Sequence, residues 1–183
     1  LERSRPDGRL LGLDADPDAL ARAREHLSAY GARVRLVHAN FRALAAVARA
    51  EGFEQVAGIL FDLGVSSDTL ERSGRGFSFR RDEPLDMRYD PTTGVTAAEL
   101  LARSSERELR QLLRAYGEEP HAARIARAIV EARARAPLRT TGQLVAVIER
   151  ALGGARGRIH AATRTFQALR IAVNDELESL RLA

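Results

Sequence analysis

The protein has 183 residues, of which 45% are hydrophobic and 30% are charged. This length suits one domain, or one domain with a small inserted module, and the composition excludes a wholly disordered chain. Cysteine is absent, the four histidines have no metal-ligand spacing, and no apolar run is long enough to cross a membrane. We therefore predict no disulfide, no thiol nucleophile, no zinc site built on thiolates and no membrane span.

The basic residues are all arginines, and the net charge is +4. Arginine suits phosphate because its planar group donates two parallel hydrogen bonds, although a lysine-free composition can also reflect codon bias. Thirteen arginines and seven glutamates fall between residues 95 and 165, so this segment carries +6 and the rest of the chain −2. The basic character is therefore concentrated in the second half, where contacts to nucleic acid are expected.

The first 65 residues alternate strand and helix signals. Strands are predicted at 8–14, 34–38 and 56–62, the last almost continuously apolar. A helix follows Asp16 and Pro17 and stops at Gly31, and a second helix begins at Asn40 or Phe41. This β-α-β-α-β order predicts part of a doubly wound parallel sheet.

Residues 63–94 lose all periodicity and read as a long polar loop. Helical patterns return from Thr96 to Leu152, with a capping box at Ser105 and Glu108. A basic link then leads to one last amphipathic helix, which starts near Thr163 and carries an apolar stripe to the end of the chain.

Two acids follow predicted strands directly. Asp14 ends the first strand and Asp62 ends the third, and the carboxyl ends of parallel strands form the ligand-binding edge of such sheets. An acid there can accept hydrogen bonds from ribose hydroxyls, but Asp14 could equally be a solvated or capping residue. No glycine-rich phosphate loop occurs, which suggests that the first strand and its loop lie upstream of Leu1.

The long loop offers further polar candidates. Ser66 and Ser67 could include a nucleophile, although a turn serine is the better interpretation. Three acids could bind a metal or exchange protons, or could simply pair with neighbouring arginines: Asp82, Glu83 and Asp86.

Two polar residues near the last helix have open roles. His160, among arginines, could touch phosphate or lie in an exposed link. Asn174 interrupts an apolar pattern that includes the core candidate Phe166, and its amide could bond a loop or a substrate.

Several stretches together resemble one family. They are 62–67 (DLGVSS), 76–79 (GFSF), 84–88 (PLDMR), 116–119 (YGEE), 124–129 (RIARAI) and 163–171 (TRTFQALRI). In this order and spacing they resemble the bacterial small-subunit rRNA cytosine-N4 methyltransferases of the MraW or RsmH type. The resemblance covers essentially the whole chain.

The resemblance implies a Rossmann-like methyltransferase sheet, incomplete here, with an inserted all-helical domain. The expected domains are 1–94, the partial methyltransferase domain with its catalytic loop; 95–160, the arginine-rich helical insertion; and 161–183, a helix that returns to the first domain. It also implies that the family's glycine-rich loop should precede Leu1 and its late strands should follow Ala183.

The implied activity is methyl transfer from S-adenosylmethionine to the exocyclic N4 amino group of a cytosine in the decoding region of 16S rRNA. Asp62, Ser66 and Asn174 are the catalytic candidates. The cofactor candidates are Asp14, which would hold the ribose, Phe41, which would line the adenine site, Asp62, and Thr69, which stands where many members carry glutamine.

The implied partner is small-subunit rRNA or the 30S particle. Its expected contacts are seven arginines: Arg80, Arg88, Arg124, Arg127, Arg156, Arg158 and Arg164. A cytoplasmic location is expected, and the oligomeric state is left open, with a homodimer among the options. The alternative function is a catalytically inactive RNA-binding fragment of such an enzyme, and a nucleotide-dependent oxidoreductase is disfavoured because no G-x-G-x-x-G occurs.

Overall fold

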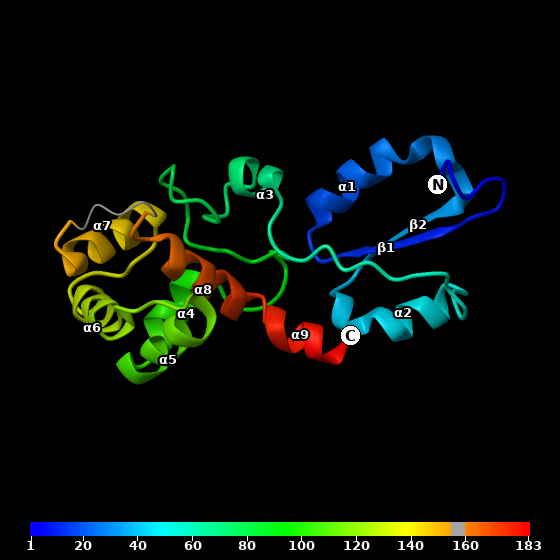
Figure 1. The fold of residues 1–183 in the computed structure, drawn as a ribbon. Coiled ribbons are helices and arrows are strands. Elements are labelled where there is room, and N and C mark those ends of the chain that lie inside the picture. Colours follow the sequence, from blue (N-terminus) through cyan, green and yellow to red (C-terminus); the bar gives the residue numbers. More distant parts are fainter. Residues whose placement is uncertain (155–159) are drawn as a thin grey trace. The chain divides into compact units, whose positions relative to one another are not determined.

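The computed structural model describes residues 1–154 and 160–183, which form two compact units (Figure 1). The first unit combines Leu1–Gly64 with Glu176–Ala183, and the second contains Val65–Asp175. Each unit has its own internal packing and is described by itself.

The first unit is built on two parallel strands. Strand β1 (Leu10–Asp14) pairs with β2 (Val34–His38), in a register that places Leu10 opposite Val34 and Asp14 opposite His38. Both predicted strands are confirmed, and so is their parallel pairing, which gives the chain a mixed α/β architecture.

Helices connect and flank this strand pair (Figure 1). Helix α1 (Pro17–His26) begins where the Asp16 side chain accepts a hydrogen bond from the Asp18 N–H and where proline occupies the first turn. A 3-10 helix, η1 (Ser28–Arg33), leads into β2. After β2 follow η2 (Phe41–Ala43) and α2 (Leu44–Ala50), and α9 (Glu176–Leu182) packs against η2.

The third predicted strand does not form. The segment 56–62 has no regular secondary structure, and the side chains of Ile59 and Leu60 are 62% and 89% exposed. A strand needs a neighbour to hydrogen-bond with, and no described strand of the first unit pairs with this segment. An apolar run indicates burial, but it does not by itself supply a pairing partner.

The second unit is helical. Its helices are α3 (Ser67–Arg72), α4 (Ala97–Arg103), α5 (Glu106–Gly117), α6 (Ala122–Arg133), α7 (Thr141–Leu152) and α8 (Thr163–Val173). Capping boxes begin α4, α5 and α7, because Thr96, Ser105 and Thr140 each accept from the third residue of the helix and that residue's side chain reaches back. The box predicted at Ser105 is confirmed.

One apolar core holds these helices together. Helix α5 packs against both α6 and α8, and α6 packs against α7. The largest fully buried side chains of this core include Leu109, Leu113, Ile125, Ile129, Leu144, Ile148 and Leu169. The core position predicted for Phe166 is also confirmed, since that ring is 4% exposed.

Part of the long polar loop belongs to this core. Leu85 and Met87 are 2% and 0% exposed, and the Leu85 N–H donates to the carbonyl oxygen of Arg139. The second packing unit therefore begins at Val65, whereas we expected the helical insertion to begin at residue 95. The expected domain limits stay a prediction. The limits of the packing units differ from them because residues 84–87 pack among the helices of the second unit.

The segment predicted to form one last helix forms two, α8 and α9. The prediction of one continuous apolar stripe to the end of the chain is therefore wrong. Asn174 ends α8, and Asp175 has a left-handed backbone with φ of 50°. That conformation cannot continue a right-handed helix. Helix α8 belongs to the second unit and α9 to the first, and Leu177 and Leu180 are exposed rather than part of one stripe.

Candidate functional site

In the first unit, polar groups gather where β1 and β2 end. Asp14 lies opposite His38 in the register, and its carboxylate accepts a hydrogen bond from the Asp16 N–H at 2.8 Å. The imidazole Nε2 of His38 lies 3.0 Å from the carbonyl oxygen of Ala15. These contacts shape the turn between β1 and α1, at the edge where parallel sheets bind ligands.

The carboxyl group of Asp14 has a raised pKa, although the residue is exposed. Removal of water raises the pKa of this carboxyl group, and the backbone N–H of Asp16 opposes that rise. Because the residue is exposed, its carboxylate is accessible to a further donor, such as a hydroxyl group. This arrangement is compatible with both interpretations of Asp14, the ligand acceptor and the turn residue.

Two aromatic rings meet next to this edge. Phe41 starts η2 directly after the Asn40 cap, whose side chain accepts from the Arg42 N–H. The ring of Phe41 lies 6.1 Å from that of Phe61 in an edge-to-face arrangement. Asp62 follows Phe61 in sequence and is exposed, so the first unit contains Asp14, Phe41 and Asp62 together.

The second unit contains the other catalytic and cofactor candidates. Ser66 caps α3, since its Oγ accepts from the Thr69 N–H at 3.1 Å. The two hydroxyl oxygens lie 3.0 Å apart, and Thr69 is 6% exposed. The structure thus brings Ser66 and Thr69 together as a helix cap, which matches the turn-serine interpretation.

Asn174 bonds only backbone in the described structure. Its Oδ1 accepts from the Tyr89 N–H at 2.7 Å, and its Nδ2 donates to the carbonyl oxygens of Met87 (2.7 Å) and Arg170 (2.9 Å). The sequence left open whether the Asn174 amide bonds a loop or a substrate. In the structure it bonds the loop that contains Met87 and Tyr89.

The loop acids are engaged in structural contacts. Asp82 accepts from the Gly142 N–H and Glu83 from the Gly76 N–H. Asp86 receives a two-pronged ion pair from Arg88, with both N···O distances at 2.7 Å. Burial by itself would raise the pKa of Asp86, but the hydrogen bonds and charge of Arg88 outweigh it and hold the pKa below its usual value.

The predicted phosphate contacts divide into three groups. Arg80, Arg124 and Arg164 are exposed and form no ion pair within residues 1–154 and 160–183. Arg88 and Arg127 are occupied, by Asp86 and by Glu131 at 2.8 Å respectively. The last group, Arg156 and Arg158, lies outside the described residues.

His160 is held by its neighbours. Its Nδ1 accepts from the Ala162 N–H at 3.1 Å, its ring stacks on Phe79 with centroids 4.5 Å apart, and its Nε2 lies 3.6 Å from Glu149. The Nδ1 contact requires an imidazole that is unprotonated at that nitrogen. His160 is exposed, as the link interpretation expects, and the phosphate contact stays a prediction.

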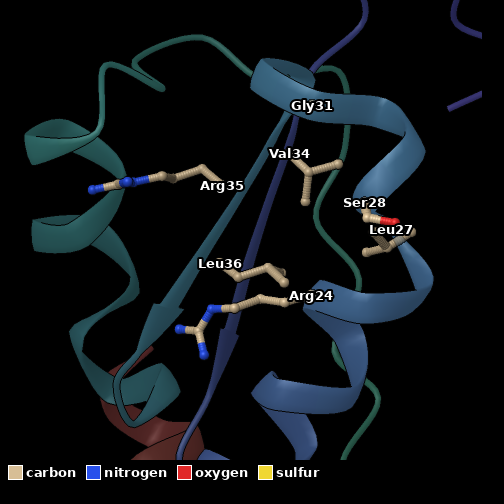
Figure 2. Close-up of a pocket in the computed structure, with 7 residues that line it drawn as sticks. All are labelled: Arg24, Leu27, Ser28, Gly31, Val34, Arg35 and Leu36. Carbon is tan, nitrogen blue, oxygen red and sulfur yellow. The ribbon is translucent and has the colours of Figure 1, made fainter.

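A small cavity of about 220 Å³ lies in the first unit, between α1, η1 and β2 (Figure 2). Its lining includes Leu27, Gly31 and Val34, and Val34 is the first residue of β2. This is the amino end of the strand, opposite the edge with Asp14. Figure 2 shows the Arg35 side chain extending toward α2, where it pairs with Glu51. No predicted site residue lines the cavity, so we do not assign it a function.

Metal-ligating clusters and membrane-spanning helices are both absent from the described residues. These residues contain no cluster of three or more metal-ligating side chains. No helix among them is both long and apolar enough to span a membrane.

Phe61 and His38, in the part of the first unit that contains Asp14, were not among the site residues predicted from the sequence. Phe61 was treated as part of a buried strand, although its place beside Asp62 was a usable signal. His38 was assigned only to a strand, and its contact to Ala15 depends on a pairing between segments that the sequence does not show.

Comparison with known proteins identifies the family. The model of the MraW methylase family matches residues 1–183. A protein of Thermomicrobium roseum named Ribosomal RNA small subunit methyltransferase H is 55% identical over 98% of this chain and 55% of its own length. Relatives of the same name from Dehalococcoides mccartyi and Geobacter sp. are 52% and 50% identical, over 52% and 58% of their lengths. The chain thus spans about half the length of the curated relatives it matches, and with its full-length match to the family model it belongs to the MraW methylase family.

Proposed function

We propose that this chain is part of an S-adenosylmethionine-dependent methyltransferase that acts on the N4 amino group of a cytosine in the decoding region of small-subunit rRNA. The family and the names of its relatives support an rRNA methyltransferase. The motif resemblance supports the N4 position and the decoding region. The observation that carries the proposal is that the first unit contains Asp14 at the end of β1, the Phe41–Phe61 ring pair, and Asp62 directly after Phe61.

The residues of this edge suit the cofactor. The carboxylate of Asp14 is exposed at the end of β1, where ribose hydroxyls would be able to donate to it. The Phe41 and Phe61 rings offer an apolar wall for adenine. When bound, S-adenosylmethionine supplies an electrophilic methyl group, and we assign its retention to Asp14, Phe41 and Asp62, with Thr69 as a further contact.

Asp62 has the chemistry required at the target base. A cytosine amino group is a poor nucleophile because its lone pair is delocalised into the ring. A carboxylate that accepts a hydrogen bond from this group keeps electron density on nitrogen and orients it, and it can take the proton afterwards. The exposed position of Asp62 leaves it accessible to a base that has left its stack.

The roles of Ser66 and Asn174 are indirect in this proposal. Ser66 shapes the start of α3, and Asn174 holds the backbone on both sides of Arg88. RNA phosphates would be held by the exposed arginines Arg80, Arg124 and Arg164, largely without sequence readout. A cytoplasmic location follows from a ribosomal substrate, and a homodimer stays a prediction that light scattering would test.

Calorimetric titration of the 183-residue chain with S-adenosylhomocysteine tests the proposal. We expect micromolar binding, about −8 kcal/mol, which Asp14→Ala and Asp62→Ala weaken at least tenfold. Asp7→Ala is the matched control, since Asp7 is an exposed acid of the same unit. No binding by a folded chain would instead favour the inactive RNA-binding fragment.

A further inference from the structure

The outer face of α5 carries a row of arginines that the sequence analysis did not select. Arg107, Arg110 and Arg114 are exposed and lie three and four residues apart, so they share one face of the helix. The row extends about 10 Å along the helix axis at 1.5 Å per residue. Within residues 1–154 and 160–183, none of the three forms an ion pair.

The acids of α5 form no ion pair with this row in the described structure, although Glu108 attracts the neighbouring Arg107. Glu108 closes the capping box with Ser105. Glu106 attracts Arg127 on the neighbouring α6, where it contributes to the raised pKa of that guanidinium. The charge of the row is therefore left largely uncompensated.

Helix stability does not explain the row. Arg110 and Arg114 are four residues apart, and like charges at this spacing disfavour a helix by a few tenths of a kcal/mol. Elsewhere the chain uses this spacing for opposite charges, as in Asp68 with Arg72, Glu99 with Arg103 and Arg127 with Glu131. Helix α5 also has Glu106 four residues before Arg110, but in the described structure these two side chains form no ion pair.

Helix α8 brings a fourth arginine close to the end of the row. A methyl group at Gly117 would lie 2.5 Å from the carbonyl oxygen of Arg164, so the start of α8 contacts the end of α5. Arg114 lies one turn before Gly117, and the Arg164 side chain is exposed. The basic surface therefore spans the junction of two helices whose packing is fixed.

We propose that Arg107, Arg110, Arg114 and Arg164, the α5 arginine row, bind the sugar-phosphate backbone of the rRNA substrate. A row of about 10 Å is long enough to contact more than one phosphate of an RNA strand. Arginine donates two hydrogen bonds to a phosphate, and such contacts position an RNA without reading its bases. This inference rests on the proposed function and identifies where its substrate would be held.

Salt-dependent RNA binding tests the row. We would measure fluorescence anisotropy of a labelled hairpin RNA with a single-stranded loop, bound to the 183-residue chain from 50 to 300 mM salt. Arg107→Gln, Arg110→Gln and Arg114→Gln, combined, should weaken binding at least tenfold and reduce the salt slope by about 2, since each phosphate contact contributes about 0.7. Arg164→Gln alone should weaken it a few-fold.

The matched control removes the same charge from the other unit. Arg3, Arg5 and Arg49 are exposed, and their combined change to Gln should alter the affinity less than twofold. Equal losses in both triple variants, an unchanged affinity in the α5 variant, or no RNA binding by the parent chain would each overturn the inference. If the α5 variant binds RNA as tightly as the parent chain, an acidic protein partner becomes the alternative ligand of the row.

Cofactor binding separates this inference from the proposed function. Titration of the α5 variant with S-adenosylhomocysteine should match the parent chain, since the row belongs to the second unit and Asp14 to the first. Normal RNA binding without cofactor binding would count against the proposed enzyme alone.

Discussion

The side chain of Asn174 is bonded to the backbone of Tyr89, 85 positions earlier in the chain, with Oδ1 accepting from the N–H at 2.7 Å. The same amide donates to the carbonyl oxygen of Met87, whose backbone has φ of 63° although the residue is not glycine. An unfavourable backbone conformation persists only where its surroundings hold it. Asn174 therefore joins the end of α8 to the PLDMR segment.

Loss of this amide should destabilise the protein. Asn174→Ala leaves the Tyr89 N–H and the Met87 carbonyl oxygen without their partner, and we expect a loss of about 2 to 3 kcal/mol in the free energy of unfolding, measured by urea denaturation. Asn174→Asp should recover only part of it, because a carboxylate accepts from Tyr89 but cannot donate to Met87. A change below about 0.5 kcal/mol in the alanine variant would contradict this role.

Two buried threonines make a matched pair. The Oγ1 of Thr141 accepts from the Glu83 N–H at 3.0 Å and donates to the carbonyl oxygen of Arg81 at 2.8 Å. The Oγ1 of Thr165 is also buried but has no hydrogen-bond partner in the described structure. Thr141→Val should cost about 1 to 3 kcal/mol, whereas Thr165→Val should be neutral or stabilising.

Thermal and urea unfolding of both valine variants would check this contrast. The two changes remove the same atoms from equally buried sites, so a general effect of valine in the core would appear in both. Similar losses in the two variants would show that the Thr141 contacts contribute little.

Gly117 permits α5 and α8 to approach each other. Because a methyl group there would lie 2.5 Å from the Arg164 carbonyl oxygen, Gly117→Ala must displace backbone. We expect a net loss of about 1 to 2 kcal/mol despite the better helix propensity of alanine. Gly58 has nothing within 4 Å of the same added group, so Gly58→Ala should leave the unfolding midpoint unchanged and serves as the control.

The Asp86–Arg88 pair should make stability depend on pH. The pKa of Asp86 is lowered in the folded state, so its contribution is present above the pKa of the unfolded chain, about 3.9, and is lost as pH falls through the lower folded value. Asp86→Asn should therefore cost about 2 kcal/mol at pH 7 and progressively less below pH 4.

Urea denaturation of the parent and the Asp86→Asn variant between pH 2.5 and 7 would measure this difference. Glu99→Gln is a useful comparison, because the pKa of that exposed carboxyl is also lowered, first by hydrogen bonds from Thr96 and to a smaller extent by the charges of Arg103 and Arg88. A constant difference between parent and Asp86→Asn at all pH values would show that the ion pair does not cause the loss.

Local sequence patterns were enough to predict most of the helices and strands and to indicate the family. Periodicity and capping signals identified β1, β2 and the helices from α4 to α7, because these depend on residues close in sequence. The position of Asp14 at a strand end and of Phe41 after the next strand also followed from the β-α-β order. The motifs from DLGVSS to TRTFQALRI indicated the family that the comparison identified.

Tertiary structure decided the rest. Whether 56–62 forms a strand depends on a pairing partner, and whether the last helix continues depends on what the Asn174 amide finds in a loop 85 positions away. The pairing of charges also depends on tertiary structure. Arg88 forms an ion pair with Asp86, whereas Arg107, Arg110 and Arg114 form none in the described structure. The sequence by itself determined which residues are apolar, helical or basic, since those are local properties. Only the folded chain determined which of them are buried, paired or free, because those depend on contacts between distant segments.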